Sequence, residues 1–349
     1  MRLSRAYFYT MQFGLFTFGD IGTNPATGDT IAAPQRLQYL VEEAELAEAV
    51  GLDVFGVGEH HRPDYAVSAP AVVLGAIAAR TKRIRLSSAV TVLSSEDPVR
   101  AYQQFATVDG LSGGRAELMA GRGSFIESFP LFGYDLKDYD SLFEEKLELL
   151  LRIRQSAILN WKGTHTQTIS QRGVFPRSVQ EPLPVWIAVG GTTGSVVRAA
   201  QYGLPLALAI IGGQPAHFAP LIDLYKETYA KSGHPEDARQ VAINCHTFIA
   251  PTTQEARDTF WPPYASVMTR IGRERGWPAM TRPQFDAACG PNGALLVGSP
   301  QEVADKIAAH RALFGHTRFA AQMSIGVVPQ PALMRSIELF GSAVTPQFR

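Results

Sequence analysis

Eight short apolar runs alternate with stretches of helical periodicity along nearly the whole 349-residue chain. Continuous apolar runs are typical of strands buried on both faces, and regular alternation of strands with helices indicates parallel pairing. A parallel β/α barrel closes with eight strands, whereas a doubly wound open sheet has no fixed number. Alternation alone does not establish closure, so the open sheet remains the alternative. The count of eight favours a TIM (β/α)8 barrel.

The barrel is expected to be a single domain covering residues 1–349, because no linker-like composition and no tandem repeat divides the chain. Residues 1–10 precede the first strand and are expected to be a flexible extension. The longest insertion, 253–293, follows the seventh strand and is expected to contain helices and a mobile loop. The eight expected strands span 11–18, 52–61, 84–93, 115–121, 185–189, 204–211, 241–250 and 319–328.

Side chains with capping chemistry mark three of the expected helix starts. Asp97 precedes a proline, which is the usual order of an N-cap and a first-turn residue. Ser141 with Glu144, and the Ser-Pro-Gln-Glu stretch at 299–302, have the serine-to-glutamate spacing of a capping box. We therefore expect helices to begin at these three points.

The composition narrows the classes of partner and the cellular location. Lys and Arg together number 32, as do Asp and Glu, so the formal net charge is zero and nucleic acid is not an expected partner. The two cysteines, Cys245 and Cys289, lack metal-binding or redox spacing and are expected to be buried thiols. No apolar stretch approaches the roughly 18 residues of a membrane helix, and no signal peptide is evident. We expect a cytoplasmic protein without membrane contact.

The second strand ends in three polar residues, Glu59, His60 and His61. In a parallel β/α fold this carboxyl end is where ligands bind. The alternative is that the carboxylate caps a helix or forms an ion pair and that the histidines are ordinary surface residues. A metal site is not expected, because adjacent residues of a strand point to opposite faces and no third His or Cys motif accompanies them.

Two glycine-rich segments at other strand ends have the chemistry of phosphate binding. Arg122 lies between Gly121 and Gly123, where its planar fork can face a phosphate while the backbone approaches closely. Residues 190–193, Gly-Gly-Thr-Thr, open a helix and offer amides and hydroxyls at its N-terminus. Together they predict a phosphorylated cofactor or substrate. Either segment alone is also compatible with a simple turn, and neither is a dinucleotide fingerprint.

The chain resembles the bacterial luciferase-like flavin-dependent monooxygenase family, barrel flavoproteins that use reduced FMN and oxygen. The matching motifs occur in the family's order from the first strand to the last helix. They are Gly58-Glu-His-His61, Ser88-Ala-Val-Thr-Val-Leu93, Asp97-Pro-Val-Arg100, Leu111-Ser-Gly-Gly-Arg115, Gly121-Arg-Gly123, Phe132-Gly133, Pro184-Val-Trp-Ile187 and Val297-Gly-Ser-Pro300.

The resemblance implies a role for each matching residue. Ala89 and Val90 would flank a non-proline cis peptide beneath the isoalloxazine ring. His60 would be the acid or base beside the reactive face of the flavin, since imidazole titrates near neutrality, and Glu59 would lie near the ring. Arg122 would bind the FMN phosphate. The remaining implied cofactor-binding residues are Gly121, Ser124, Gly190, Gly191, Thr192 and Thr193.

The implied activity is oxygenation of a small organic substrate by O2 and reduced FMN that a partner reductase supplies. A homodimer is expected by analogy, with helices 34–50 and 70–81 as candidate contact faces. Deazaflavin-dependent hydride transfer and noncatalytic flavin binding are the alternatives. Two positions depart from the family: Asp140 stands near the place of a second basic residue, and Ile210 replaces the strand-six tryptophan of the luciferases, so light emission is not expected.

Overall fold

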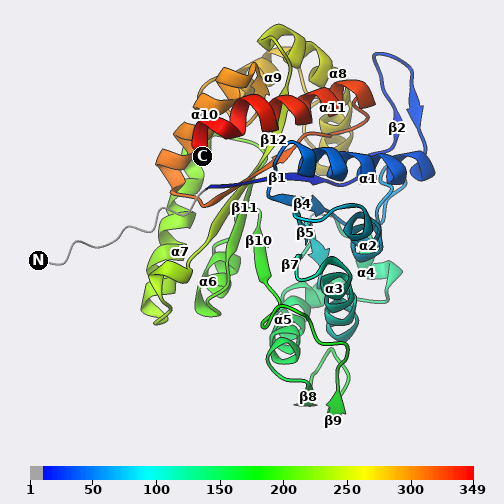
Figure 1. Ribbon diagram of the computed structural model, residues 1–349, viewed down its shortest axis with the longest axis vertical. Helices are drawn as coiled ribbons and strands as arrows, with labels where there is room; N and C mark the ends of the chain where they lie inside the picture. Colours follow the sequence, from blue (N-terminus) through cyan, green and yellow to red (C-terminus); the bar gives the residue numbers. More distant parts are fainter. Residues whose placement is uncertain (1–10, 124) are drawn as a thin grey trace, which may run out of the picture.

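A closed barrel of parallel strands forms the centre of the computed structural model, which describes residues 11–123 and 125–349 (Figure 1). The expected extension at 1–10 lies outside the described residues. Neighbouring strands pair in parallel around the sheet, and pairing of Val185 with Leu118 joins its two ends. The TIM-barrel prediction is therefore confirmed. The barrel strands are β1 (Gln12–Thr17), β4 (Val54–Val57), β5 (Arg85–Ser88) with β6 (Thr91–Val92), β7 (Ala116–Gly121), β10 (Val185–Val189), β11 (Leu206–Ile210), β12 (Val241–Ile249) and β14 (Arg318–Gln322).

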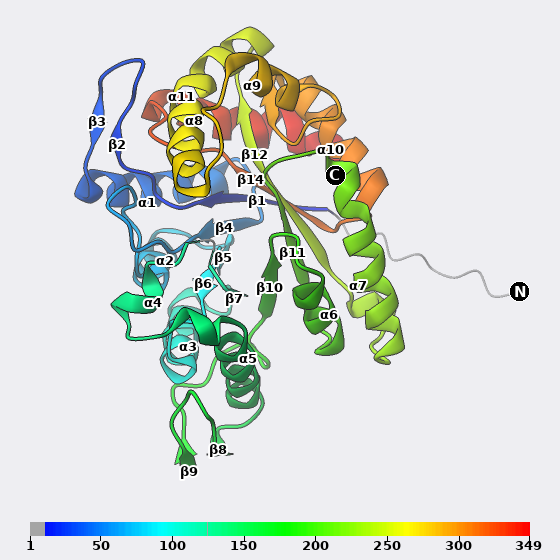
Figure 2. The same ribbon diagram turned by 180° about the vertical axis from the view of Figure 1, so that it is seen from behind.

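Helices surround the barrel and bury its outer face, as Figures 1 and 2 show from opposite sides. Their inner faces are apolar and pack with the outward-facing strand residues in one large core. The helices are α1 (Ala33–Ala49), α2 (Pro70–Arg80), α3 (Pro98–Ser112), α4 (Ser128–Leu131), α5 (Tyr139–Gln155), α6 (Thr193–Gln201), α7 (Ala219–Lys231), α8 (Thr253–Arg275), α9 (Arg282–Cys289), α10 (Pro300–Phe314) and α11 (Gln330–Leu339). None of the helices in the described part of the chain has the length and apolar character to cross a membrane.

Two of the three predicted helix caps are confirmed and one is wrong. Asp97 accepts hydrogen bonds from the Val99 and Arg100 amides, at 2.8 and 3.0 Å. Ser299 forms the expected capping box with its glutamate at the start of α10. Ser141, in contrast, lies inside α5, where its hydroxyl donates to the Asp138 carbonyl at 3.1 Å. A 3-10 turn, Leu136–Asp138, leads straight into this helix, so α5 has already begun at Tyr139.

The insertion after the seventh barrel strand consists mainly of helix. α8 and α9 occupy most of 253–293, and residues 276–281 join them. Pro262 and Pro263 lie within α8, although proline usually disfavours a helix interior. The short strand β13 (Leu296–Gly298) then pairs with the end of β12. It was not predicted as a strand because three residues carry no measurable period.

A second excursion, between α5 and β10, contains a small hairpin. β8 (Ile158–Trp161) pairs antiparallel with β9 (Ile169–Gly173), away from α8 and α9 in both views (Figure 2). Another two-stranded unit, β2 (Gly22–Thr23) with β3 (Thr30–Ile31), follows the first barrel strand. These units lie outside the closed sheet and leave its strand order unchanged.

Small side chains keep part of the barrel interior open. A separate apolar cluster inside the barrel contains the large residues Phe16, Met119 and Trp186. On β11, β12 and β14 the members of this cluster are all alanines, at 207, 242 and 320. Because alanine fills little volume, this side of the barrel leaves room for a ligand.

Candidate active site

A cavity of about 380 Å³ lies at the carboxyl ends of the barrel strands. This is the end at which TIM barrels bind their ligands. Strands far apart in the sequence contribute to one wall, as the sequence motifs predicted. The predicted site residues that line the cavity are Glu59, His60, Ala89, Val90, Gly121, Arg122, Gly190 and Thr192.

Two of the predicted residues that the structure describes do not contribute to this lining. Gly191 and Thr193 are exposed and are not among the residues that line the cavity. Gly191 has a φ of 130°, a conformation that glycine tolerates and other residues rarely adopt, so its glycine is explained by the turn into α6. Ser124 lies outside the described residues.

The predicted phosphate-binding segments meet at one end of the cavity. Arg122 follows β7 and donates a hydrogen bond to the Thr192 hydroxyl at 3.1 Å. Thr192 in turn donates to the Ser195 hydroxyl at 2.9 Å, on the first turn of α6. The Arg122 guanidinium lies 4.9 Å from the centre of the Tyr139 ring and also pairs with Asp140. A guanidinium, two hydroxyls and a helix N-terminus therefore converge where an anion would fit.

Glu59 supports the segment beyond the third strand. One of its carboxylate oxygens accepts from the Val92 amide at 3.0 Å, and the other contacts the His61 ring nitrogen at 2.8 Å. The carboxylate is buried. Residues 89–92 contain the Ala89–Val90 peptide, which is cis, and form the part of the wall next to Gly121. Glu59 thus connects the end of β4 to this wall.

We expect Glu59→Ala to lower the free energy of unfolding by about 2 kcal/mol, because it leaves the buried Val92 amide without an acceptor. Glu59→Gln keeps an oxygen at this position and should cost less. Urea unfolding followed by circular dichroism measures both changes. The control is Glu42→Ala, which removes an exposed carboxylate from α1. Equal effects of Glu59→Ala and Glu42→Ala would contradict the supporting role.

His60 lies in an aromatic enclosure and is only 8% exposed. Its ring centre is 4.5 Å from that of Phe18, 4.4 Å from Tyr65 and 5.0 Å from Phe125. Burial lowers the pKa of His60 to about 4, although nearby Asp64 opposes that shift. The expectation that this imidazole titrates near neutrality is therefore wrong. At neutral pH the ring is uncharged, so its free nitrogen can accept a hydrogen bond, and the lowered pKa makes it a weaker base than an ordinary imidazole.

The opposite wall carries three polar residues that the sequence motifs did not identify. Asn244 and His246 come from β12, and Gln322 is the register partner of His246 on β14. Asn244 donates to the Ala320 carbonyl at 3.2 Å. His246 Nδ1 and Gln322 Nε2 are buried and have no hydrogen-bond partner. Because buried polar atoms are usually paired, these two are candidates to contact a ligand.

The remaining lining residues come from several strand ends and loops. Most are apolar or small, which gives the cavity an apolar body between its two polar ends. They are Phe16, Phe18, Val92, Met119, Gly123, Tyr139, Ala188, Val189, Ser195, Ala207, Ala209 and Ile211. Ile210, which stands in place of the luciferase tryptophan, is fully buried in the outer core, whereas its neighbour Ile211 lines the cavity.

His246 makes the stability of the fold depend on pH. Burial lowers its pKa to about 4, whereas the unfolded chain takes up this proton near pH 6.5. The stabilising contribution is therefore present above pH 6.5 and is lost as the pH falls toward 4. Linkage gives a loss of about 1.5 kcal/mol between pH 6.5 and 5 for this one group.

Between pH 6.5 and 5, we expect the free energy of unfolding of His246→Leu to fall by about 1.5 kcal/mol less than that of the unmodified protein. Urea unfolding at pH 8, 6.5 and 5 measures the difference. The matched control is His217→Leu, which removes an exposed histidine. A pH dependence of His246→Leu that equals that of the unmodified protein would contradict burial of a neutral imidazole.

The two adjacent histidines do not form a common metal site. His61 pairs with Glu59 and packs edge-on against Phe132 at 5.1 Å, whereas His60 lies in its own aromatic enclosure. Within 11–123 and 125–349, no three His, Cys, Asp or Glu side chains are grouped so that they could hold a metal ion.

Comparison with known proteins identifies both oxygenases and deazaflavin enzymes as relatives. A family model described as luciferase-like monooxygenase matches residues 11–317. The chain is 32% identical over 185 residues to the N-acetyl-S-alkylcysteine monooxygenase of Bacillus subtilis (strain 168), covering 52% of this chain and 53% of that protein. It is 32% identical over 161 residues to the F420-dependent glucose-6-phosphate dehydrogenase of Amycolatopsis mediterranei (strain U-32), covering 44% and 47%.

A solved structure supports the fold over nearly the whole chain. The oxygenating constituent of the 3,6-diketocamphane monooxygenase of Pseudomonas putida, a type II Baeyer-Villiger monooxygenase in complex with FMN, superposes with a TM-score of 0.76. The match covers 97% of this chain and 98% of that one at 18% identity. At this identity the likeness establishes the shared barrel and nothing finer.

Proposed function

Because the chain belongs to the luciferase-like monooxygenase family, we propose that it oxygenates a small organic substrate with O2 and reduced FMN. One observation carries the proposal. The cavity has an anion-binding end at Arg122, Thr192 and Ser195, and an apolar body that leads from it to His60. A flavin mononucleotide has the same two parts, a phosphate and a flat, largely apolar ring system.

The residues present fit this cofactor. Arg122 would hold the phosphate as a bidentate donor, with Gly190 allowing close approach of the backbone and Thr192 contributing its hydroxyl. Ala89, Val90 and Gly121 would lie along the ring. A Cβ atom added to Gly121 would approach Val90 to 2.7 Å, so a larger residue would disturb this wall. When bound, reduced flavin supplies the electrons with which O2 is activated.

The charges around the phosphate end favour FMN over a deazaflavin coenzyme. F420 continues beyond its phosphate as an acidic oligoglutamyl tail. In this protein Asp140 pairs with Arg122, and Glu144, Glu145 and Glu148 line the neighbouring surface hollow beside α6. Only Arg198 and Lys162 offset these carboxylates among the residues that line that hollow. An acidic tail would meet like charge there, which disfavours F420.

Deazaflavin-dependent hydride transfer remains the second candidate function. The observation that favours it is the similarity to the F420-dependent dehydrogenase from Amycolatopsis mediterranei. The third candidate is noncatalytic flavin binding, for which we would expect the protein's own side chains to fill the mouth of the barrel. Instead a cavity of about 380 Å³ lies open beside His60.

The proposed substrate is a small organic molecule with an apolar body and one or two hydrogen-bonding groups. The apolar lining accounts for the body, and Asn244, His246 and Gln322 account for the polar groups. We also propose that a separate reductase supplies the reduced FMN. A homodimer would cover three exposed apolar side chains, Val72 on α2, Leu111 on α3 and Phe175 just after β9, which are 72%, 67% and 58% exposed.

Substrate-dependent oxygen uptake tests the proposed function. The protein is loaded anaerobically with reduced FMN, mixed with O2 and assayed against a panel of N-acetyl-S-alkylcysteines, the substrate class of the Bacillus subtilis relative. We expect at least one compound to yield a product that incorporates ¹⁸O from ¹⁸O2. If the flavin is oxidised but no compound of the panel is converted to an oxygenated product, monooxygenation of these compounds is contradicted. Reduction of a substrate by the reduced deazaflavin would favour the second candidate function.

A further inference from the structure

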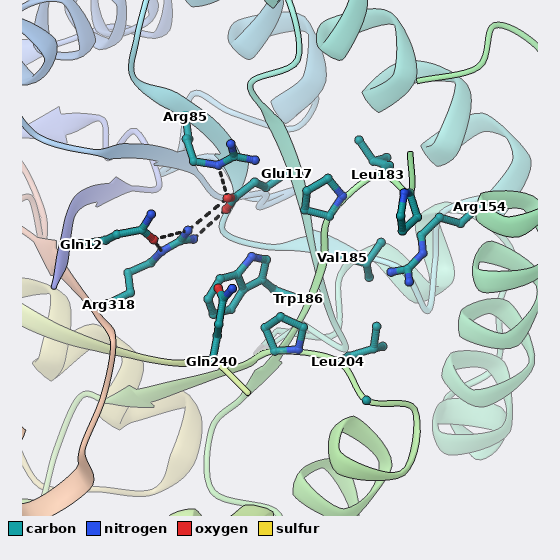
Figure 3. A pocket seen from close by; sticks show the side chains of 14 residues that line it. Gln12, Arg85, Glu117, Arg154, Leu183, Val185, Trp186, Leu204, Gln240 and Arg318 are labelled. Atoms are coloured by element: carbon teal, nitrogen blue, oxygen red, sulfur yellow. Dashed lines mark hydrogen bonds and ion pairs between the residues drawn. The ribbon is translucent and has the colours of Figure 1, made fainter. Parts of the chain in front are cut away.

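A second cavity, of about 320 Å³, lies at the amino-terminal ends of the barrel strands, opposite the candidate active site (Figure 3). Its lining includes the first residues of β10 and residues next to the starts of β11 and β12. Three arginines, Arg85, Arg154 and Arg318, line it together with a single carboxylate, Glu117. The cavity therefore carries an excess of positive charge.

Two of these arginines are neutralised in part by Glu117. Arg318 donates to both oxygens of this carboxylate, at 2.6 and 3.1 Å, and Arg85 pairs with the same group. Burial alone would raise the pKa of Glu117, but the two guanidinium groups lower it to about 2. Arg318 also donates to Gln12 at 2.9 Å and lies 4.2 Å from the centre of the Trp186 ring. This cluster is internally satisfied and closes the base of the barrel.

The third arginine has no such partner. Arg154 comes from α5, and its guanidinium makes no hydrogen bond or ion pair with any residue of the described chain. Its Nε is buried and unpaired. Burial lowers the pKa of Arg154, and no carboxylate opposes that shift. The Gln240 side chain lines the same cavity and likewise makes no hydrogen bond to the described residues.

Figure 3 shows how these groups are arranged. Arg318 and Glu117 lie on one side of the hollow and Arg154 on the other, with Trp186 and Val185 between them. A desolvated guanidinium without a counter-charge is costly, and its planar fork matches a carboxylate or a phosphate. An apolar surface beside that fork suits a ligand with a short apolar body.

We propose that this amino-terminal cavity binds a small organic anion, whose carboxylate or phosphate group pairs with Arg154 and hydrogen-bonds to Gln240. The site goes beyond the proposed function, since it is separate from the flavin cavity and shares no lining residue with it. Its occupant would join α5 to the starts of β10, β11 and β12, and would thereby stabilise the folded barrel by mass action.

Calorimetric titration of the full-length protein with benzoate and, separately, with inorganic phosphate tests this site at constant ionic strength in chloride. We expect saturable binding of at least one probe. Binding of benzoate alone would assign the site to carboxylates, and binding of phosphate alone to phosphates. Absence of saturable binding with both probes would overturn the proposal.

Single substitutions test whether the anion binds at Arg154. Arg154→Met should weaken binding at least tenfold, and Gln240→Leu should weaken it less. Arg152→Met is the matched control, because it removes the same charge from an exposed position on the same helix. Arg122→Ala should leave binding unchanged, since that residue lines the other cavity. Equal affinities of Arg154→Met and Arg152→Met, or loss of binding only in Arg122→Ala, would overturn the proposal.

Discussion

Replacing Arg122 by alanine should weaken the binding of reduced FMN by about 2 kcal/mol, or roughly 30-fold, because it removes a charge-assisted contact to the phosphate. Anaerobic fluorescence titration measures the change. Arg122→Lys keeps the charge but loses the planar fork, so its affinity should lie between those of the alanine variant and the unmodified protein. The matched control is Arg198→Ala on α6, which removes an arginine that pairs with Glu144 and does not line the cavity.

Removal of the Asp140 carboxylate should change the affinity for FMN in the opposite direction from removal of Arg122. Its carboxylate pairs with Arg122 and would compete with the phosphate for the guanidinium. The Asp140 side chain is 73% exposed, so solvent screens the pair and its contribution is at most about 1 kcal/mol. We therefore expect Asp140→Asn to strengthen FMN binding by a few-fold. Unchanged affinities of both Arg122→Ala and Asp140→Asn would contradict the assignment of this end of the cavity to the phosphate.

His60→Ala should retain flavin binding but lose roughly 100-fold or more in turnover, since a positioned acid or base contributes at least that much. His60 lines the cavity and is neutral at neutral pH, so it can accept a proton from a reacting group at the flavin face. The measurement is substrate-dependent oxygen uptake with a compound that the panel identifies. Flavin affinity is determined in parallel to separate chemistry from binding.

Two variants control for the loss of a side chain at this position. His60→Gln keeps a hydrogen-bonding group without an imidazole and should remain slow. His61→Gln alters the adjacent imidazole, which pairs with Glu59 and does not line the cavity, so turnover should fall much less. Full activity of His60→Ala, or an equal loss in both positions, would exclude proton transfer by His60.

Local patterns in the sequence predicted the barrel and the convergence of its strand ends. Continuous apolar runs located all eight barrel strands, and parallel pairing then placed Arg122 near Thr192, which lies 70 residues away in the chain. The start of α5 was predicted wrongly at Ser141 because the spacing to Glu144 imitates a capping box. The preceding 3-10 turn, which begins the helix earlier, has no comparable signature.

The parts of the candidate site that the sequence did not predict depend on tertiary packing. The pKa of His60 follows from an enclosure built by Phe18, Tyr65 and Phe125, which come from three separate loops. Nothing in the Glu-His-His motif indicates those neighbours. Asn244 and His246 did leave a signal, because polar residues at alternate positions of an otherwise apolar strand indicate inward-facing side chains.

Because at least one relative depends on F420, the identity of the cofactor is the central question for this protein. Parallel anaerobic titration with reduced FMN and with reduced F420 tests it most directly. The proposed phosphate end, with its surrounding carboxylates, predicts saturable binding of reduced FMN and at least tenfold weaker binding of F420. Arg122→Ala should weaken the FMN interaction in the same assay. Tighter binding of F420 than of FMN, or no saturable binding of FMN, would contradict the proposal of an FMN-dependent monooxygenase.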